Sequence, residues 1–233
     1  MNAKFTLTLK ALAIGAALYA SAAASAQSAQ PAPNDGPGTW AVSVGYNNIS
    51  PHETDALSAP SIPDSRTDPH SDGQPVLNIY YNFTDHITAM LALGAPYTHD
   101  LYGAGSLSGA GKLGSLKQLP PTLFGRWNFL EANAPVRPYV GLGLTYADFR
   151  SEKGSGTLTA ISNPGGPPTT FTVDNAWGVT PQLGVTWNIN QRWFLDAWVT
   201  KTYISSTVHL STGQSANAPL NPTSEAITVG YRF

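Results

Sequence analysis

The 233-residue sequence predicts an all-β fold: an eight-stranded antiparallel transmembrane β-barrel with short turns at one end and long loops at the other. Three observations support this prediction. Apolar residues alternate with polar or small residues along eight segments, which is the period of a β-strand. Short and long connections alternate between the segments. Only 11% of the residues are charged, while Gly (22) and Pro (19) are abundant, which disfavours a helical bundle or a coiled coil.

The start of the chain has the pattern of a secretory signal peptide. A basic start is followed by a short apolar run at 11–20, and residues 24–26 (ASA) fit a cleavage site. The run has about half the length of a membrane-spanning helix. The sequence has no Cys, which excludes disulfides and thiol nucleophiles. The expected organisation is a cleaved signal peptide at 1–26, a flexible periplasmic leader at 27–39 and a bacterial outer-membrane barrel at 40–233.

The first four expected strands lie before residue 130. Residues 40–47 (WAVSVGYN) and 76–83 (VLNIYYNF) alternate large apolar side chains with polar, small or aromatic ones. Residues 87–94 (ITAMLALG) and 122–129 (TLFGRWNF) also keep their larger apolar side chains on one face. The period of two predicts a strand in each segment.

The last four expected strands show the same pattern, with bulky apolar residues on one face and Gly, Thr and polar residues on the other. They are 139–146 (YVGLGLTY), 177–187 (WGVTPQLGVTW), 193–200 (WFLDAWVT) and 226–233 (AITVGYRF). An even number of strands places both chain ends in the periplasm. The long connections, expected to be loops, are 48–74, 97–118, 150–172 and 205–225.

The positions of the aromatic residues indicate which face meets lipid. A water-soluble barrel such as a lipocalin turns its apolar face inward. Here the polar face carries small residues that suit the crowded interior of an eight-stranded barrel, and aromatic residues occupy both ends of the apolar face, as in membrane-interface girdles. One girdle is expected from Trp40, Phe83, Phe129, Trp187, Trp193 and Phe233, and the other from Tyr46, Tyr97, Tyr146, Trp177 and Tyr203.

Several segments along the mature chain are distinctive: 45–51 (GYNNISP), 83–87 (FTDHI), 119–122 (LPPT), 137–143 (RPYVGLG), 177–178 (WG), 193–197 (WFLDA) and 230–233 (GYRF). Together they resemble the OmpW family of small outer-membrane barrels, and the resemblance extends over essentially the whole mature chain. It implies a narrow barrel with an apolar interior pocket, associated with the uptake of small hydrophobic molecules. The loops depart most from the family pattern.

The inward face contains charges near the periplasmic rim and larger, mostly apolar side chains farther from it. Unpaired charges inside a narrow barrel are costly, so we expect a bonded cluster around the single acid, which would block the lumen. The expected cluster comprises Arg126, Arg137, Asp196 and Arg232. The expected lumen and ligand residues are Tyr80, Met90, Phe124, Tyr139 and Trp198.

Prolines mark a possible sideways exit through the barrel wall. Pro96 ends the third expected strand, and Pro120 and Pro121 begin the fourth. Proline cannot donate a ladder hydrogen bond, so strand pairing should be weak there and could form a lateral gate. Pro181 is a second candidate. Equally, these prolines could serve only to end strands.

The last strand ends in an assembly signal. Phe233 is the terminal residue, with Tyr231 and Val229 on the same expected lipid-facing side. This pattern resembles the signal that is read by the barrel-assembly machinery, which is therefore an expected partner during biogenesis.

Motifs for other chemistries are weak, and we expect no enzyme activity, cofactor or metal. The G-x-G-x-x-G match at 109–114 lacks the strand-to-helix context of a nucleotide site. The net charge of −2 and the lack of a basic run argue against nucleic acid. His209 near Ser205, Ser206 and Ser211 is the best catalytic candidate, but loop polarity explains it more simply. The first long loop carries an irregular acidic group that fits no metal motif, namely His52, Glu53, Asp55, Asp64, Asp68, His70 and Asp72.

Two functions remain open at this point. The first is an outer-membrane channel for passive uptake of small hydrophobic molecules, with outer-membrane lipid and the solute as partners and lateral release into the membrane. The alternative is a structural or surface-interaction barrel, contacting phage, bacteriocins or a host, whose interior is filled by side chains. Density of a detergent or lipid tail in an upper cavity lined by Phe124 and Trp198 would favour the channel, whereas an interior packed solid by side chains would favour the alternative.

Overall fold

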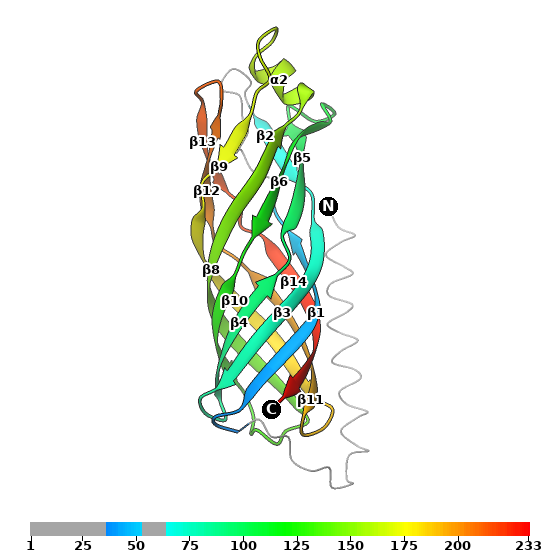
Figure 1. Ribbon diagram of the computed structural model, residues 1–233, viewed down its shortest axis with the longest axis vertical. Coiled ribbons are helices and arrows are strands. Elements are labelled where there is room, and N and C mark those ends of the chain that lie inside the picture. Colours follow the sequence, from blue (N-terminus) through cyan, green and yellow to red (C-terminus); the bar gives the residue numbers. More distant parts are fainter. Residues whose placement is uncertain (1–35, 53–63) are drawn as a thin grey trace. The chain divides into compact units, whose positions relative to one another are not determined.

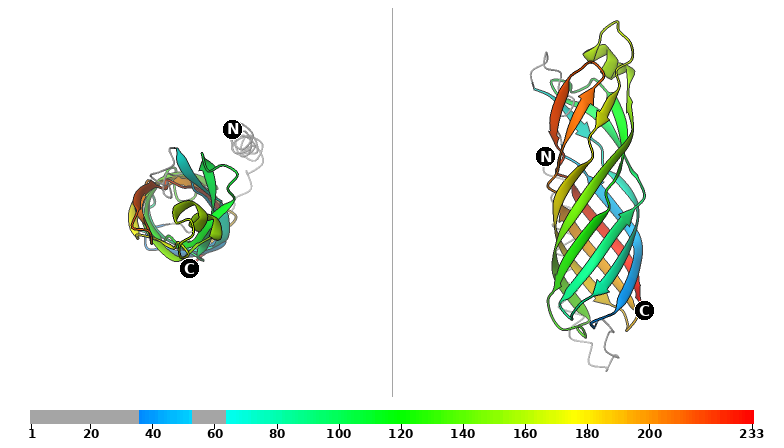
Figure 2. Two further views of the ribbon diagram at one scale, coloured as in Figure 1. Left: turned by 90° about the horizontal axis from the view of Figure 1, so that it is seen from above. Right: turned by 60° about the vertical axis from the view of Figure 1, so that its left-hand side comes forward.

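The computed structural model describes residues 36–52 and 64–233. Its main feature is a closed antiparallel barrel of eight strands, in which each strand pairs with the next and the first pairs with the last (Figures 1 and 2). The expected signal peptide and most of the expected leader lie outside the described residues. The barrel strands are β1 (Trp40–Ser50), β3 (Asp72–Asn82), β4 (Ile87–Gly94), β7 (Thr122–Asn128), β8 (Val136–Gly154), β10 (Ala176–Asn188), β11 (Trp193–Lys201) and β14 (Thr223–Arg232).

All eight expected strands are present, and their faces are as predicted. Large apolar side chains point away from the lumen and stay exposed, for example Leu142 at 62% and Leu183 at 60%, while the intervening residues are buried. Such a continuous apolar exterior belongs in lipid rather than in water. Tyr97 departs from the prediction, because it is 1% exposed and points inward instead of joining the outer girdle.

The expected long loops are only partly loops, because many of their residues form strands, some continuing the barrel sheet and others a separate three-stranded sheet. At about 3.3 Å per residue, the 19 residues of β8 span about 60 Å, roughly twice the hydrocarbon core. We call the part beyond the barrel the extension. It comprises the far end of β8 together with β2 (Ser65–Pro69), β5 (Tyr97–Gly105), β6 (Lys112–Leu119), α2 (Gly156–Ser162), β9 (Phe171–Val173), β12 (Ser205–Leu210) and β13 (Ser215–Pro219).

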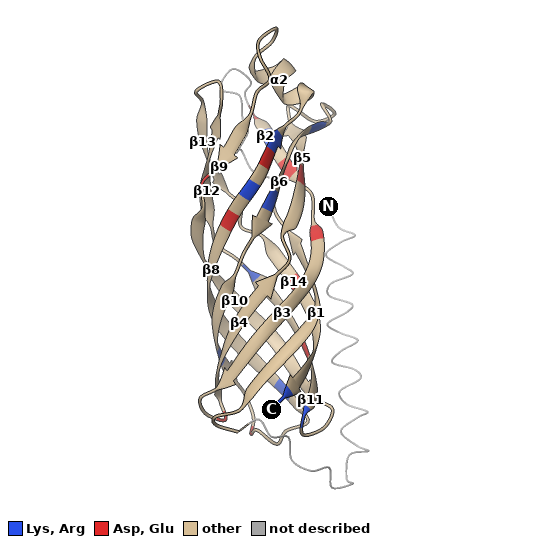
Figure 3. Cartoon of the chain, viewed as in Figure 1, with Lys and Arg blue, Asp and Glu red and all other residues tan. Residues whose placement is uncertain are grey.

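The extension folds around an apolar core of its own. Leu101, Leu113, Phe149, Phe171 and Val208 are all less than 9% exposed and belong to one cluster of packed side chains. Its outer surface is charged, unlike that of the barrel: Figure 3 shows acidic and basic residues alternating along the upper part of β8. This change of surface polarity places the extension in water, beyond the membrane.

The short helix α2 is the only helix in the described part of the chain. It begins at a Ser155 cap, whose hydroxyl accepts a hydrogen bond from the backbone N–H of Leu158. Over residues 36–52 and 64–233, no helix has the length and apolar character needed to cross a membrane.

Candidate functional site

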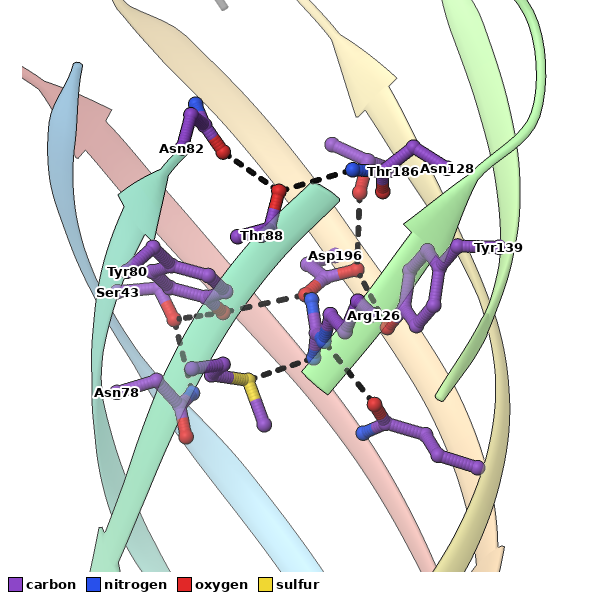
Figure 4. Close-up of polar contacts among 12 residues, drawn as sticks. Ser43, Asn78, Tyr80, Asn82, Thr88, Arg126, Asn128, Tyr139, Thr186 and Asp196 are labelled. Atoms are coloured by element: carbon purple, nitrogen blue, oxygen red, sulfur yellow. Dashed lines mark hydrogen bonds and ion pairs between the residues drawn. The ribbon is translucent and has the colours of Figure 1, made fainter. Parts of the chain in front are cut away.

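Asp196 is the centre of a polar layer that crosses the lumen. It is fully buried on β11, and its two carboxylate oxygens receive four hydrogen bonds from four other strands (Figure 4). Arg126 Nη1 and Tyr80 Oη donate to Oδ2 at 2.8 and 3.1 Å. Tyr139 Oη and Thr186 Oγ1 donate to Oδ1 at 2.9 and 3.2 Å. A buried carboxylate is tolerated when it is paired and fully hydrogen-bonded in this way.

Arg126 fills the space beside this carboxylate. Its guanidinium carbon lies 4.2 Å from the ring centroid of Tyr139 and 5.2 Å from that of Tyr80. Its Nε donates to Gln182 Oε1 at 3.0 Å, and Nη2 contacts the Met90 sulfur at 2.6 Å. The cation is therefore held by an acid, two aromatic faces and an amide. This layer forms the floor of the lumen site, and we refer to it as the floor.

The expected cluster of four charges is only partly correct. Arg126 pairs with Asp196, but Arg137 donates to the backbone carbonyl of Asp85, and Arg232 Nη2 donates to Asn188 Oδ1 at 2.5 Å. Thr186 lies between Arg137 and Asp196 in the strand register. The register partner of Asp196 on β14 is Thr228, four residues from Arg232, or about 13 Å along the strand. Arg137 and Arg232 therefore bind closer to the periplasmic rim.

A second polar layer lies beside the floor, toward the short turns. Asn128 Nδ2 donates to Thr88 Oγ1 at 2.9 Å, and Thr88 donates to Asn82 Oδ1 at 2.6 Å (Figure 4). All three side chains are buried. Side chains from β3, β4 and β7 thus pack the lumen between the floor and the periplasmic end.

A cavity of about 60 Å³ lies on the other side of the floor, toward the extension. Phe124 and Trp198 line it, as expected, together with Ile49, Val76 and Ile204. Tyr80, Met90 and Tyr139 do not line it, because they are part of the floor. The expected lumen residues therefore divide into two wall residues and three floor residues.

A second cavity, of about 40 Å³, lies within the extension and is almost entirely apolar. Leu101, Phe149 and Phe171 are among its lining residues. Gln118 and Pro222 line both cavities, so the two are adjacent. Together they run from the core of the extension to the floor.

The strand ladder is interrupted at the expected lateral gate. Pairing of β4 with β7 ends at Ala92 and Thr122, and pairing of β5 with β6 begins at Tyr97 and Gln118. Pro96, Pro120 and Pro121 lie in the interval between these two ladders. Pro181 differs, because it pairs opposite Leu142 within the unbroken β8–β10 ladder.

The terminal residues face outward. Phe233 is 72% exposed and donates its backbone N–H to the carbonyl of Trp40 at 3.0 Å. Tyr231 lies between Phe233 and Trp193, with ring centroids 5.5 and 5.0 Å away. Val229 lies on the same face. These rings form part of an aromatic band at the periplasmic rim.

The best catalytic candidate has a different partner from those expected. His209 Nδ1 contacts Ser215 Oγ at 3.2 Å, and its Nε2 contacts Asp174 Oδ2 at 3.2 Å. The His209 and Asp174 side chains are 46% and 60% exposed, and neither cavity is lined by any of the three residues. Both side chains therefore lie at the surface of the extension, away from the two cavities.

The acidic group of the first long connection is divided by the structure. Glu53 and Asp55 lie outside the described residues, while Asp72 accepts hydrogen bonds from Gln74 and from the backbone of Thr98. Within the described ranges, no three His, Cys, Asp or Glu side chains lie close enough together to hold a metal ion.

Sequence reasoning missed the polar wall of the barrel cavity. Its polar lining residues are Asn47, Thr122, Thr145, Thr180, Thr200, Thr202 and Ser224. Thr200, Thr202 and Ser224 lie beyond or near the ends of the expected strands. For the others, the available signal was their place on the inward, polar face of the alternating pattern in β1, β7, β8 and β10.

Comparison with known proteins gives a consistent result. Residues 38–233 match the OmpW family. The chain belongs to the OmpW family. Outer membrane protein W of Vibrio cholerae is 34% identical over 170 residues, which cover 70% of this chain and 75% of the relative. The dibenzothiophene metabolism operon protein PahQ of Pseudomonas aeruginosa is 24% identical over 200 residues, or 83% and 88% of the two chains.

The fold is shared with solved structures. The crystal structure of outer membrane protein OprG from Pseudomonas aeruginosa matches with a TM-score of 0.73 and 23% identity, over 85% of this chain and 98% of that one. The protein is thus an OmpW-family barrel of the bacterial outer membrane, with short periplasmic turns and an extracellular extension.

Proposed function

We propose that this OmpW-family barrel is a passive channel for small hydrophobic molecules. A solute enters the apolar cavity of the extension, passes into the barrel cavity and leaves sideways into the bilayer. No chemistry, cofactor or metal is required, because movement of an apolar solute from water to lipid is itself favourable by about 25 cal/mol per Å² of apolar surface.

The observation that carries this proposal is the position of the barrel cavity. It lies against the ladder interruption and is lined from both sides of it: by Gly94 and Tyr97 on one side, and by Gln118, Pro120 and Thr122 on the other. Below it, the bonded floor of Arg126 and Asp196 blocks a straight path to the periplasm. The side wall is the remaining exit.

The size of the cavity bears on how the exit works. About 60 Å³ is less than half of the roughly 150 Å³ in which benzene has been accommodated inside a protein. Passage of a ring therefore requires the wall to widen. Widening at the interruption breaks no ladder hydrogen bonds, whereas widening elsewhere breaks several.

The relative PahQ supports an apolar solute. Its name places it in an operon for dibenzothiophene metabolism, and dibenzothiophene is an apolar aromatic compound. At 24% identity this similarity suggests the kind of solute and does not specify which one.

The proposal is tested by restoring backbone donors at the interruption. We expect Pro96→Val combined with Pro120→Val to strengthen pairing and to lower uptake of a small apolar solute by intact cells at equal barrel abundance. Pro181→Val is the matched control, because it replaces a proline within a continuous ladder. Unchanged uptake in the double variant, with uptake still above that of cells lacking the barrel, would show that the exit lies elsewhere.

The small cavity volume favours a second candidate, a structural or surface-interaction barrel. In that case the extension would bind phage, bacteriocin or host surfaces, and the interior would be only packing. Equal solute uptake by cells with and without the barrel would support this alternative.

A further inference from the structure

The lining of the barrel cavity combines two kinds of side chain. Ile49, Val76, Phe124 and Trp198 are apolar. The residues that carry a hydroxyl group form what we call the polar wall, namely Thr122, Thr145, Thr180, Thr200, Thr202 and Ser224. None of the lining residues is charged. A wholly hydrocarbon solute would satisfy only the apolar part of this lining.

The polar wall contains a directed chain of hydroxyl groups. Thr180 donates to Thr202 at 3.1 Å, which uses its single proton. Thr145 must then donate to Thr180 at 2.6 Å. Thr122 lies 2.8 Å from Thr145, and its own proton is also within reach of the Pro120 carbonyl, to which it donates at 3.2 Å. The chain therefore runs toward Thr202, whose own proton is left unused. It places a free donor at the cavity wall.

Further polar groups at the same cavity lack a partner among the described residues. The hydroxyls of Thr200 and Ser224, which are register neighbours on β11 and β14, form no hydrogen bond within residues 36–52 and 64–233. Asn47 donates to Tyr97 Oη at 2.8 Å, but its buried Oδ1 accepts no hydrogen bond from the described residues. The wall thus offers hydroxyl donors.

We infer that the solutes of this channel are small neutral molecules with an oxygen function, such as a ketone or an alcohol, on an apolar skeleton. The inference rests on the proposed channel function and narrows its substrate class. The apolar skeleton lies against Phe124 and Trp198, and the oxygen accepts hydrogen bonds from Thr200, Thr202 or Ser224.

The selectivity follows from a difference between ketone and alkane in how many hydrogen bonds of the polar wall are lost when the solute binds. Every solute that enters displaces water from the polar wall. A ketone oxygen replaces some of the hydrogen bonds that are lost, whereas an alkane leaves the wall groups unpaired. A site built for hydrogen bonding strongly rejects an analogue that lacks the polar group. The absence of charged lining residues disfavours ions and zwitterions.

A matched pair of solutes tests the inference. The barrel-dependent initial uptake of labelled octane and 2-octanone is measured in intact cells and normalised to the free aqueous concentration of each. We expect the ketone rate to exceed the alkane rate by about tenfold or more.

Thr200→Val with Ser224→Ala should lower this ratio at least threefold while leaving the octane rate unchanged or higher. Thr98→Val, an exposed change on β5, is the control.

The outcomes separate this inference from the proposed function. If both solutes enter through the barrel at similar rates, or if the variant keeps the wild-type ratio, the polar wall only holds water and the inference fails, while the channel function stands. If neither solute shows barrel-dependent uptake, the channel function fails, and the inference that depends on it fails as well. If the double variant retains the octane rate, its barrel is still folded, and the lower ratio reports on the polar wall. The single variant Ser224→Ala, which removes only one hydroxyl group, gives a second, milder check of the same kind.

Discussion

The Arg126–Asp196 pair shows how a charge can lie inside a narrow barrel. Both side chains are at most 3% exposed, and each has partners besides the other. Two tyrosines and a threonine donate to the carboxylate, and aromatic rings cover the cation. Removing either charge would leave the other buried and uncompensated, which is more costly than removing both.

We therefore expect Asp196→Ala to destabilise the barrel by about 3–5 kcal/mol, because Arg126 would lose its counter-ion and three hydroxyls would lose their acceptor. Asp196→Asn should cost less, since its amide oxygen still accepts. Urea unfolding of the barrel in lipid vesicles measures both effects. If Asp196→Ala and the wild type are equally stable, the Arg126–Asp196 pair does not stabilise the barrel.

His99 is a buried titratable residue of the extension. Burial lowers the pKa of His99 below its usual value near 6.5, against the opposing effects of the His70 carbonyl and the Asp72 carboxylate. The imidazole is 2% exposed, and its Nδ1 lies 2.9 Å from the His70 carbonyl oxygen. A neutral ring donates to this carbonyl without the desolvation penalty of a charge.

This pKa shift predicts a pH-dependent stability of the extension. Above pH 6.5 the ring is neutral whether the extension is folded or open. As the pH falls below 6.5, the open form binds a proton that the folded form does not bind, so stability decreases until the lower, folded-state pKa is passed. Amide hydrogen exchange of β5 and β6 should therefore show easier opening at pH 5.5 than at pH 7.5, and His99→Gln should weaken this difference. If the His99→Gln variant keeps the same difference in opening between pH 5.5 and pH 7.5, the pH dependence comes from other groups.

Individual contacts were harder to predict from the sequence than residue orientation. The period of two was enough to place Arg126, Arg137, Asp196 and Arg232 inside the barrel. It could not show which of them meet, because contact depends on the stagger between strands. That stagger separates Arg232 from Asp196 by about 13 Å along the wall.

At the scale of the elements, the barrel strands could be predicted from the sequence because each has one face in contact with lipid. The lipid-facing side must be apolar and the lumen side must be small or polar, so the alternation is regular in β7, in residues 40–47 of β1 and in residues 226–232 of β14. The extension has no such constraint, because water covers its outer face. Its strands therefore contain Gly, Pro and Ser, and the sequence predicts loops at residues such as 112–118 and 205–210, which the structure places in β6 and β12.

The last strand tests the assembly signal. Deleting Phe233 removes an aromatic ring at the periplasmic rim and its backbone hydrogen bond to Trp40. We expect a lower yield of heat-modifiable barrel in the outer membrane, measured by electrophoresis of unheated samples. Phe233→Tyr should keep most of the yield. Normal insertion of the truncated chain would rule out a role for this residue in assembly.

At the scale of the whole molecule, the barrel combines an apolar exterior with a mixed interior, the reverse of a water-soluble fold. The exposed tryptophans Trp40, Trp187 and Trp193 lie toward the periplasmic turns, and Trp177 lies toward the extension. The exterior between these levels carries Val, Leu and Ile. This arrangement fixes the depth of the barrel in the membrane, because indole rings favour the interface.

The position of each tryptophan leads to a test of the whole arrangement. Trp177 is 64% exposed toward lipid, whereas Trp198 is 7% exposed and faces the cavity. Two variants that retain only one of these tryptophans, with Phe at the other five positions, are reconstituted in vesicles of lipids brominated on their acyl chains. We expect strong fluorescence quenching of Trp177, greatest with bromines near the headgroup, and little quenching of Trp198, because the barrel wall separates it from the acyl chains. Equal quenching of both would mean that lipid reaches the cavity through an open wall, and that the interruption beside Pro96 is permanently wide rather than closed at rest.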